Sequence, residues 1–175
     1  MFDFKNKIVV ITGGARGIGK CIREKFEEAG ATVCVIDLLE NDCFVGDLAD
    51  KETLERFANK VISDYGRVDF LINNAAPKSC GITSCSYEDF EYALKVGVTA
   101  PFYLSKLFAS YFNDDASIIN ISSMNAYTPL TKIPAYSAAK AGVSNFTQWL
   151  ATHFAGTGIR CNAIAPGFLI SNQNR

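Results

Sequence analysis

The chain has 175 residues, of which 49% are hydrophobic and 20% are charged, and its formal net charge is −1. These proportions are ordinary for a globular protein of this length, so we expect residues 1–175 to form a single domain. A net charge this close to zero provides no basic field, and neither nucleic acid nor an anionic membrane is expected as a partner.

The first ten residues, MFDFKNKIVV, mix acidic and basic side chains and contain no long apolar run. They therefore indicate neither a signal peptide nor a membrane span. The strand predicted at KIVVIT (7–12) leads into the glycine-rich stretch ITGGARGIGKC (11–21), which has two interpretations. Gly14, Gly19 and Lys20 approach the Walker A pattern for a nucleoside triphosphate. Gly13, Gly17 and Gly19 instead form a turn suited to the pyrophosphate of a dinucleotide.

Two residues outside the glycines favour the dinucleotide interpretation. A Walker A loop needs Ser or Thr after its lysine to bind Mg²⁺, but here the residue is Cys21, a poor ligand for a hard cation. A dinucleotide site needs a carboxylate at the end of the second strand to bind the adenosine ribose. Asp37 ends the predicted strand TVCVID (32–37) and meets that requirement.

Further strands and helices alternate along the rest of the chain. Strands are predicted at CFVG (43–46), VDFLINN (68–74), SIINIS (117–122) and RCNAIAPG (160–167). Most are apolar at consecutive positions, which is typical of strands covered on both faces of a parallel sheet. Between them, one helix face is formed by Leu54, Phe57, Ala58, Val61 and Ile62, and a capping box of Ser86 and Asp89 opens another helix. The fold expected is a doubly wound α/β sheet.

The six cysteines are scattered, with no C-x-x-C pair, and the only histidine, His153, is distant in sequence. Cys80 and Cys85 are the closest two. We therefore expect no metal site. Reduced, mostly buried thiols and a cytoplasmic location are expected instead. His153 is expected to be structural.

Several short motifs follow one another along the chain. They are Thr12-Gly13-x-x-x-Gly17-Ile18-Gly19, Asp47-Leu48, Asn73-Asn74-Ala75-Ala76, Ser123, Tyr136-x-x-x-Lys140 and Pro166-Gly167. In this order and spacing, the chain resembles the short-chain dehydrogenase/reductase family from about residue 5 onward. The resemblance implies a Rossmann-type sheet with strand order 3-2-1-4-5-6, helices on both faces, and NAD as cofactor.

The resemblance also implies the catalytic residues. Tyr136 and Lys140 have the i, i+4 spacing that puts them on one helix face. A free tyrosine has a pKa of about 10, and a neighbouring cation lowers that pKa because it favours the phenolate. Tyr136 would exchange a proton with the substrate oxygen, Lys140 would also hold the nicotinamide ribose, and Ser123 would bind the substrate oxygen. Ser122 competes for that last role, but the spacing favours Ser123.

The cofactor residues follow from the same matched motifs. Asp47 and Leu48 resemble the residues of the family that line the adenine pocket, and Asn74 resembles the residue that contacts the adenosine ribose. The segment that closes over the nicotinamide is matched by Pro166, Gly167 and Leu169. The full set expected to bind NAD is Gly13, Arg16, Gly17, Ile18, Gly19, Asp37, Asp47, Leu48, Asn74, Ala75, Tyr136, Lys140, Pro166, Gly167 and Leu169. The carboxylate of Asp37 would repel the 2′-phosphate of NADP.

The chain departs from the family pattern in two places. Gly97 stands where the family usually has a catalytic Asn. Pro101, four residues later, has no N–H to bond the Gly97 carbonyl, so we expect a local kink and a free carbonyl for a proton relay. Close helix packing is an equally good explanation of Gly97. The chain also ends soon after Pro166, where family members continue through substrate-covering helices and a final strand.

The function expected is hydride transfer between NAD(H) and a small secondary alcohol or ketone, in a dimer or tetramer. One alternative is a catalytically silent NAD-binding protein or fragment, and another is a dehydratase or epimerase that uses the same Tyr-Lys pair. The substrate pocket is expected in loops 76–87 and 124–135, with Met124 and Tyr127 as candidate contacts.

Overall fold

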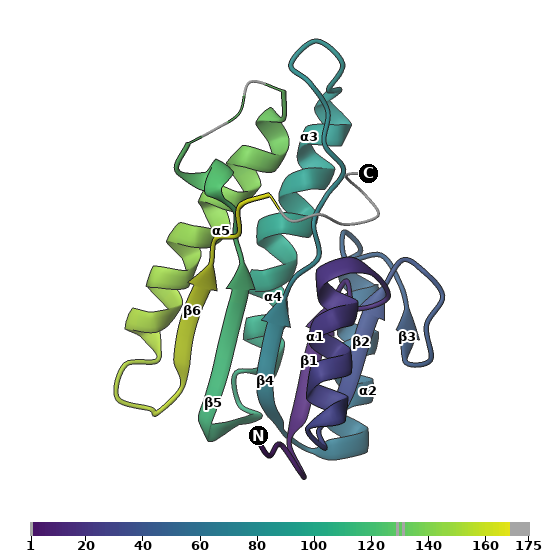
Figure 1. The fold of residues 1–175 in the computed structure, drawn as a ribbon, viewed down its shortest axis with the longest axis vertical. Helices are drawn as coiled ribbons and strands as arrows, with labels where there is room; N and C mark the ends of the chain where they lie inside the picture. The colour runs from purple at the N-terminus through teal and green to yellow at the C-terminus, as the bar shows by residue number, and fades with distance from the viewer. Residues whose placement is uncertain (1, 129, 131, 169–175) are drawn as a thin grey trace.

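The computed structural model describes residues 2–128, 130 and 132–168, and it is built on one six-stranded sheet (Figure 1). The strands are β1 (Ile8–Thr12), β2 (Thr32–Asp37), β3 (Phe44–Val45), β4 (Val68–Asn73), β5 (Phe112–Ile121) and β6 (Arg160–Ile164). Their order is β3-β2-β1-β4-β5-β6, and each neighbouring pair runs parallel. The expected doubly wound sheet and its strand order are confirmed.

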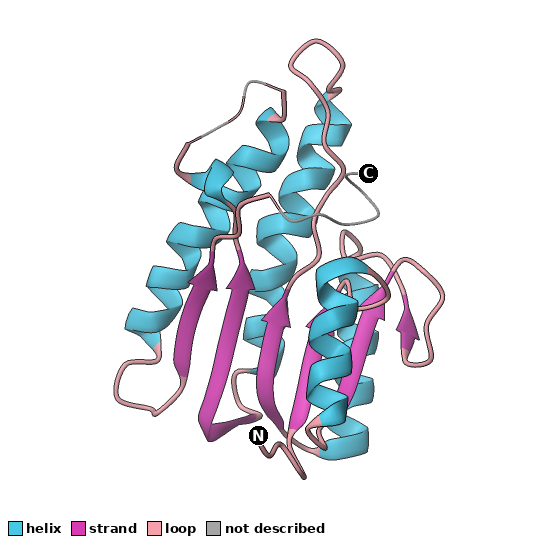
Figure 2. Cartoon of the chain, viewed as in Figure 1, coloured by secondary structure: helices cyan, strands magenta, loops and turns pink. Residues whose placement is uncertain are grey.

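Helices cover both faces of the sheet, as Figure 2 shows. They are α1 (Gly17–Glu28), α2 (Lys51–Tyr65), α3 (Tyr87–Leu94), α4 (Ala100–Phe108) and α5 (Pro134–His153). Helix α1 lies on the near face in Figure 1, and α2, α4 and α5 lie behind the strands. A π-helical turn, η1 (Lys95–Thr99), joins α3 to α4, and a short 3₁₀ turn, η2 (Met124–Ala126), follows β5.

The consecutive apolar residues of the strands divide between two clusters, one on each face. On the near face, Val9 and Ile11 of β1 pack with Phe26 of α1. On the far face, Val10 belongs to the larger cluster, together with residues such as Phe57 of α2. Apolar side chains are therefore buried on both sides of β1, which is why its sequence does not alternate.

The predicted helix signals agree with the helices observed. In α2, Leu54, Phe57, Ala58 and Val61 are buried and Ile62 packs against them, as the spacing predicted. The capping box at α3 is present, because the Ser86 hydroxyl accepts the Asp89 N–H and the Asp89 carboxylate accepts the Ser86 N–H.

Two strand boundaries differ from the prediction by more than one residue. Strand β5 begins at Phe112 rather than at Ser117, because the pairing with β4 shifts register and lets Phe112 pair with Val68. That shift could not be read from the polar residues Asn113–Asp115. Strand β6 ends at Ile164, before Pro166, whose nitrogen carries no hydrogen for a sheet ladder.

The carboxyl ends of the parallel strands lie at one edge of the sheet, the upper edge in Figure 1. Ligands bind at that edge in open α/β sheets. Within the described part of the chain, no helix combines the length and apolar character needed to cross a membrane.

Candidate active site

The glycine turn after β1 has the backbone geometry that its glycines allow. Gly13 and Gly17 have φ angles of +70° and +58°, values that side chains other than glycine rarely adopt. The Gly13 N–H donates to the Ile36 carbonyl at 2.8 Å, which ties the turn to β2. A Cβ on Gly19 would collide with the Gly13 carbonyl oxygen, so only glycine lets α1 start this close to the turn.

Asp37 lies beside this turn, at the end of β2. One carboxylate oxygen accepts the Ala15 N–H at 2.9 Å, and the other accepts the Leu39 N–H at 3.0 Å. The carboxylate is therefore held against the glycine turn, at the position where the sequence predicted a ribose ligand. Arg16 precedes α1 in an extended conformation, and both Arg16 and Ile18 are exposed.

Asn74 connects the ends of β1 and β4. Its side-chain amide donates to the carbonyls of Thr12 at 3.1 Å and Gly13 at 2.9 Å. In return, the Thr12 hydroxyl accepts the N–H groups of Asn74 at 3.0 Å and Ala75 at 3.1 Å. Asn74 thus supports the glycine turn directly, a role the sequence did not indicate.

Asp47 and Leu48 follow β3 on the other side of Asp37. Leu48 is buried, and the Asp47 carboxylate accepts the Ala49 N–H at 2.8 Å and the Tyr92 hydroxyl at 3.1 Å. Burial and the nearby Asp47 charge raise the pKa of Tyr92 to about 12, so the phenol stays protonated and donates. Tyr92 was not identified from the sequence, because this contact joins residues far apart in the chain.

The two serines after β5 point to different surroundings. The Ser122 hydroxyl lies 2.5 Å from the Ser144 hydroxyl and 3.3 Å from the Lys140 carbonyl, against α5. The Ser123 hydroxyl accepts the Asn125 N–H at 3.2 Å at the start of η2. Ser122 is therefore engaged in packing α5, which supports the choice of Ser123 as the candidate for substrate contact.

Tyr136 and Lys140 lie on one side of α5, which packs against η2. The Lys140 ammonium is 5.6 Å from the centroid of the Tyr136 ring and donates to the Ile121 carbonyl at 2.5 Å. Lys140 is 2% exposed, and burial lowers its pKa to about 8. Tyr136 is half-buried, so part of its side chain is exposed to solvent.

Gly97 lies in the π-helical turn η1, where the Ala100 N–H bonds to Lys95, one residue further back than in an α-helix. The expected local irregularity before Pro101 is therefore present. A Cβ on Gly97 would come within 2.7 Å of the Ala139 Cβ on α5. This favours the close-packing explanation of Gly97, and the proposed free carbonyl stays a prediction.

Buried polar atoms gather near the two motifs. Asn125 Oδ1 and Ser137 Oγ have no hydrogen-bond partner among the described residues. Each is a close sequence neighbour of a candidate catalytic residue, Ser123 or Tyr136. Unpartnered buried polar atoms are uncommon in folded proteins.

The segment after β6 reaches the same region. The Pro166 carbonyl accepts the Met124 N–H at 3.1 Å, so this segment is joined to η2. Gly167 is exposed. Leu169, also expected to contact the cofactor, lies outside the described residues.

The expected substrate loops meet each other, since a Cβ on Gly81 would be 3.8 Å from the Lys132 carbonyl. Tyr127 is 68% exposed and Met124 is half-buried. His153 stacks on Trp149 with ring centroids 4.9 Å apart, away from these loops, in agreement with a structural role.

The expectation that all thiols are reduced is wrong for Cys80 and Cys85, which form a disulfide in loop 76–87. The turn before α3 brings their Cα atoms to 5.0 Å, within the range for a disulfide, although the sequence has no C-x-x-C motif. The four other cysteines are free thiols. The cytoplasmic location inferred from the cysteine pattern stays a prediction.

Comparison with known proteins agrees with this geometry. The family model described as short chain dehydrogenase matches residues 7–175. The chain is 35% identical to an uncharacterized oxidoreductase of Haemophilus influenzae, over 98% of this chain and 73% of that protein. It is 38% identical to the uncharacterized oxidoreductase UxuB of Bacillus subtilis, over 89% of this chain and 60% of that protein.

Solved structures give the same result. A Haemophilus influenzae protein with bound NAD, provisionally named a D-mannonate oxidoreductase, is similar with a TM-score of 0.86 and 33% identity, over 99% of this chain and 75% of that one. An apo SCOR enzyme from Clostridium thermocellum is similar with a TM-score of 0.90 and 37% identity, over 95% of this chain and 74% of that one.

Proposed function

Because this chain belongs to the short-chain dehydrogenase/reductase family, whose named relatives are oxidoreductases, we propose that it transfers a hydride between NAD(H) and a secondary alcohol or ketone. One observation carries the proposal. The buried Lys140 ammonium lies 5.6 Å from the Tyr136 ring, on a helix that packs beside Ser123. A phenol, a cation and a hydroxyl at one strand end form a site for proton transfer to a carbonyl oxygen.

The residues at the strand ends fit a dinucleotide. Gly13 and Gly17 have positive φ angles, and a Cβ added at Gly17 would meet open space in the described structure, so a ligand can approach the turn. The first N–H groups of α1 suit a pyrophosphate. The residues proposed to bind NAD are Gly13, Arg16, Gly17, Ile18, Gly19, Asp37, Asp47, Leu48, Asn74, Ala75, Tyr136, Lys140, Pro166 and Gly167.

In this proposal, three side chains carry out proton transfer and hold the substrate oxygen. NAD(H), when bound, supplies or accepts the hydride. Tyr136 donates its phenolic proton to the substrate oxygen during reduction and takes it back during oxidation. The Lys140 cation favours the phenolate formed at Tyr136 and holds the nicotinamide ribose. The Ser123 hydroxyl donates a hydrogen bond to the substrate oxygen and positions it for transfer.

One observation favours a second function, a cofactor-binding protein with little turnover. Gly97 replaces the usual Asn, and a Cβ at this position would come within 2.7 Å of the Ala139 Cβ, so an Asn would require η1 or α5 to shift. In this alternative, NADH binds but ketones are not reduced at a useful rate. A related dehydratase or epimerase would convert substrate with no net change in the cofactor.

For the substrate, we propose a sugar acid as the first compound to test. Lys78 and Lys132 lie in the two expected substrate loops, and residues 76–87 and 124–135 contain no acidic side chain. A basic rim favours a carboxylate. The provisional name of the NAD-bound relative points to the same class of compound.

The experiment compares D-mannonate with neutral polyols and simple secondary alcohols, each with NAD, and follows absorbance of NADH. Reduction of NAD by D-mannonate, lost in Tyr136→Phe, supports both function and substrate class. Reduction by neutral alcohols alone keeps the function and rejects the sugar acid. NADH binding without turnover on any compound supports the silent protein, and substrate conversion without net NADH supports the dehydratase or epimerase.

We also propose that copies of this chain associate. Helices α4 and α5 expose Phe102, which is 45% exposed, and Trp149, which is 57% exposed, next to Phe146. Aromatic side chains are enriched in protein interfaces, and a net charge of −1 causes little repulsion between copies. Sedimentation of the wild type and of a Trp149→Lys variant tests this, because only the wild type should form dimers or tetramers.

A further inference from the structure

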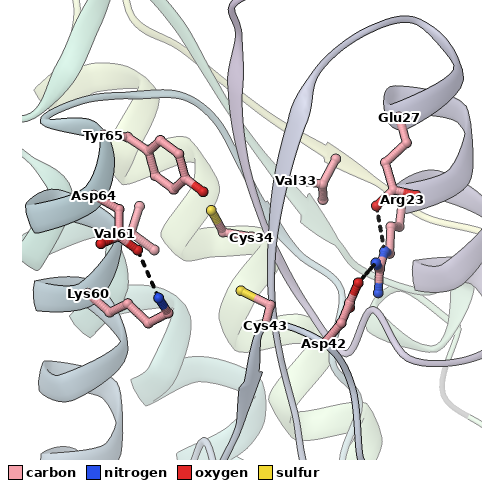
Figure 3. A pocket seen from close by; sticks show the side chains of 10 residues that line it. All are labelled: Arg23, Glu27, Val33, Cys34, Asp42, Cys43, Lys60, Val61, Asp64 and Tyr65. Carbon is pink, nitrogen blue, oxygen red and sulfur yellow. Dashed lines mark hydrogen bonds and ion pairs between the residues drawn. The ribbon is translucent and has the colours of Figure 1, made fainter.

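Two free thiols lie together on the far side of β2 from α1, outside the candidate active site. Cys34 of β2 is buried, and Cys43, just before β3, is half-buried. Both line a cavity of about 200 Å³, which Lys60, Asp64 and Tyr65 of α2 also line. Figure 3 shows both sulfur atoms turned into the space between the strands and the helix.

The strand pairing explains why the two cysteines meet. Strands β2 and β3 are in register, with Ile36 opposite Phe44 and Asp37 opposite Val45. Cys43 comes directly before this ladder, so it lies diagonally across from Cys34, and its side chain packs on the same face of the sheet as Cys34. Neighbouring strands are about 4.8 Å apart and rise about 3.3 Å per residue, so this diagonal is about 6 Å, within the Cα separation that a disulfide spans.

The surroundings make the two sulfur atoms chemically different. The interaction between the two thiols lowers the pKa of Cys43 and raises that of Cys34. The backbone at Val35 and the cation of Lys60 lower the pKa of Cys43 further, while burial and Asp42 act in the opposite direction. Lys60 is itself paired with Asp64 at 2.8 Å. Cys43, the more accessible sulfur, is therefore the better nucleophile.

We propose that Cys34 and Cys43 form an oxidation site that reacts with hydroperoxides and closes to a disulfide. The Cys43 thiolate attacks one peroxide oxygen, the O–O bond breaks, and the hydroxide released takes up the Cys43 proton as water. The Cys34 sulfur then attacks the resulting sulfenic acid. The S–S bond forms, the S–O bond breaks, and a second water leaves with the Cys34 proton. Two thiols and one hydrogen peroxide thus give one disulfide and two waters.

The other cysteines provide the contrast for this assignment. Cys21 is exposed on α1, and Cys161 is buried in β6, where burial raises its pKa to about 11. Cys80 and Cys85 are already joined to each other. A peroxide that reacted only by exposure would therefore modify Cys21 first, whereas the proposed pair makes Cys43 react first.

The experiment treats the full chain with hydrogen peroxide in the presence of dimedone and digests it with trypsin. Cleavage after Lys25 and Lys51 yields peptide 26–51, whose cysteines are Cys34 and Cys43. In the wild type this peptide should lose the mass of two hydrogens, recover it with dithiothreitol, and react about tenfold faster than the Cys21 peptide. If oxidised peptide 26–51 is then cleaved at Asp37 or Asp42, between the two cysteines, the disulfide should keep the two fragments joined.

Variants separate the two roles. Cys34→Ala should stop at a dimedone adduct on Cys43, Cys43→Ala should leave peptide 26–51 unmodified, and Cys21→Ser should behave as the wild type. The proposal is overturned if wild-type peptide 26–51 shows no loss of two hydrogens while Cys21 is oxidised, or if Cys43→Ala reacts as fast as the wild type. The wild-type measurement decides the matter even if a variant fails to fold.

Discussion

The ammonium of Lys140 lies 5.6 Å from the centroid of the Tyr136 ring, in a position that is 2% exposed to solvent. Burial disfavours the charged form of Lys140, and the same charge is what favours a phenolate at Tyr136. The protein therefore accepts a cost in stability to keep a cation beside the candidate catalytic phenol.

That cost has a measurable pH dependence. The pKa of an unfolded lysine is about 10.4, whereas burial lowers the pKa of Lys140 in the folded protein to about 8. Between these values the unfolded chain binds more protons, so the contribution of Lys140 to the free energy of unfolding rises with pH, by on the order of 3 kcal/mol in full. Denaturant unfolding across this range should show the rise, and Lys140→Met should lack it. Equal pH profiles for the two proteins would reject the lowered pKa.

Asp37 should determine the choice between NAD and NADP. Its carboxylate is held beside the glycine turn by the Ala15 and Leu39 N–H groups, where it would repel a 2′-phosphate. Asp37→Ser should shift the ratio of NADH to NADPH affinity towards NADPH by roughly tenfold or more, a change of about 1.4 kcal/mol or more. Fluorescence titration of both cofactors measures the ratio.

Glu40→Gln is the matched control for Asp37, because it removes one exposed negative charge three residues further along the chain. The control should leave the ratio unchanged. If the wild type binds NADPH as tightly as NADH, or if both variants shift the ratio equally, Asp37 does not select the cofactor.

Gly97 should not accept the asparagine that the family usually has. A Cβ there would come within 2.7 Å of the Ala139 Cβ, closer than such atoms normally approach. Overpacking of this kind typically costs about 1–3 kcal/mol, so Gly97→Asn should lower the denaturation midpoint by a corresponding amount. The second change Ala139→Gly should restore part of the loss. A stable single variant with higher turnover would instead mean that the helices separate easily and that the missing Asn limits catalysis.

Features that depend on local pattern were predictable from the sequence. The consecutive apolar residues of β1 and β4 predicted a sheet covered on both faces, and the spacing in α2 and the capping box of α3 predicted those helices. The glycine turn and Asp37 were predictable together because both follow from what a pyrophosphate and a ribose require.

Features created by long-range contacts were not predictable. The bond from Tyr92 to Asp47 joins α3 to the segment after β3, and the meeting of Cys34 with Cys43 depends on the register of two strands. The early start of β5 needs the register shift against Val68. In each case the partner is chosen by the folded arrangement, and no spacing along the chain specifies it.

The most direct test of the account is the effect of Tyr136→Phe on NADH binding and on turnover, measured in parallel. The phenol oxygen is proposed to act only at the reacting centre, so its removal should leave the NADH dissociation constant within about twofold and reduce kcat by about a hundredfold or more. Ser122→Ala, which alters the serine packed against Ser144, is the control and should retain most of the turnover. A Tyr136→Phe enzyme with near wild-type kcat would contradict the proposed mechanism.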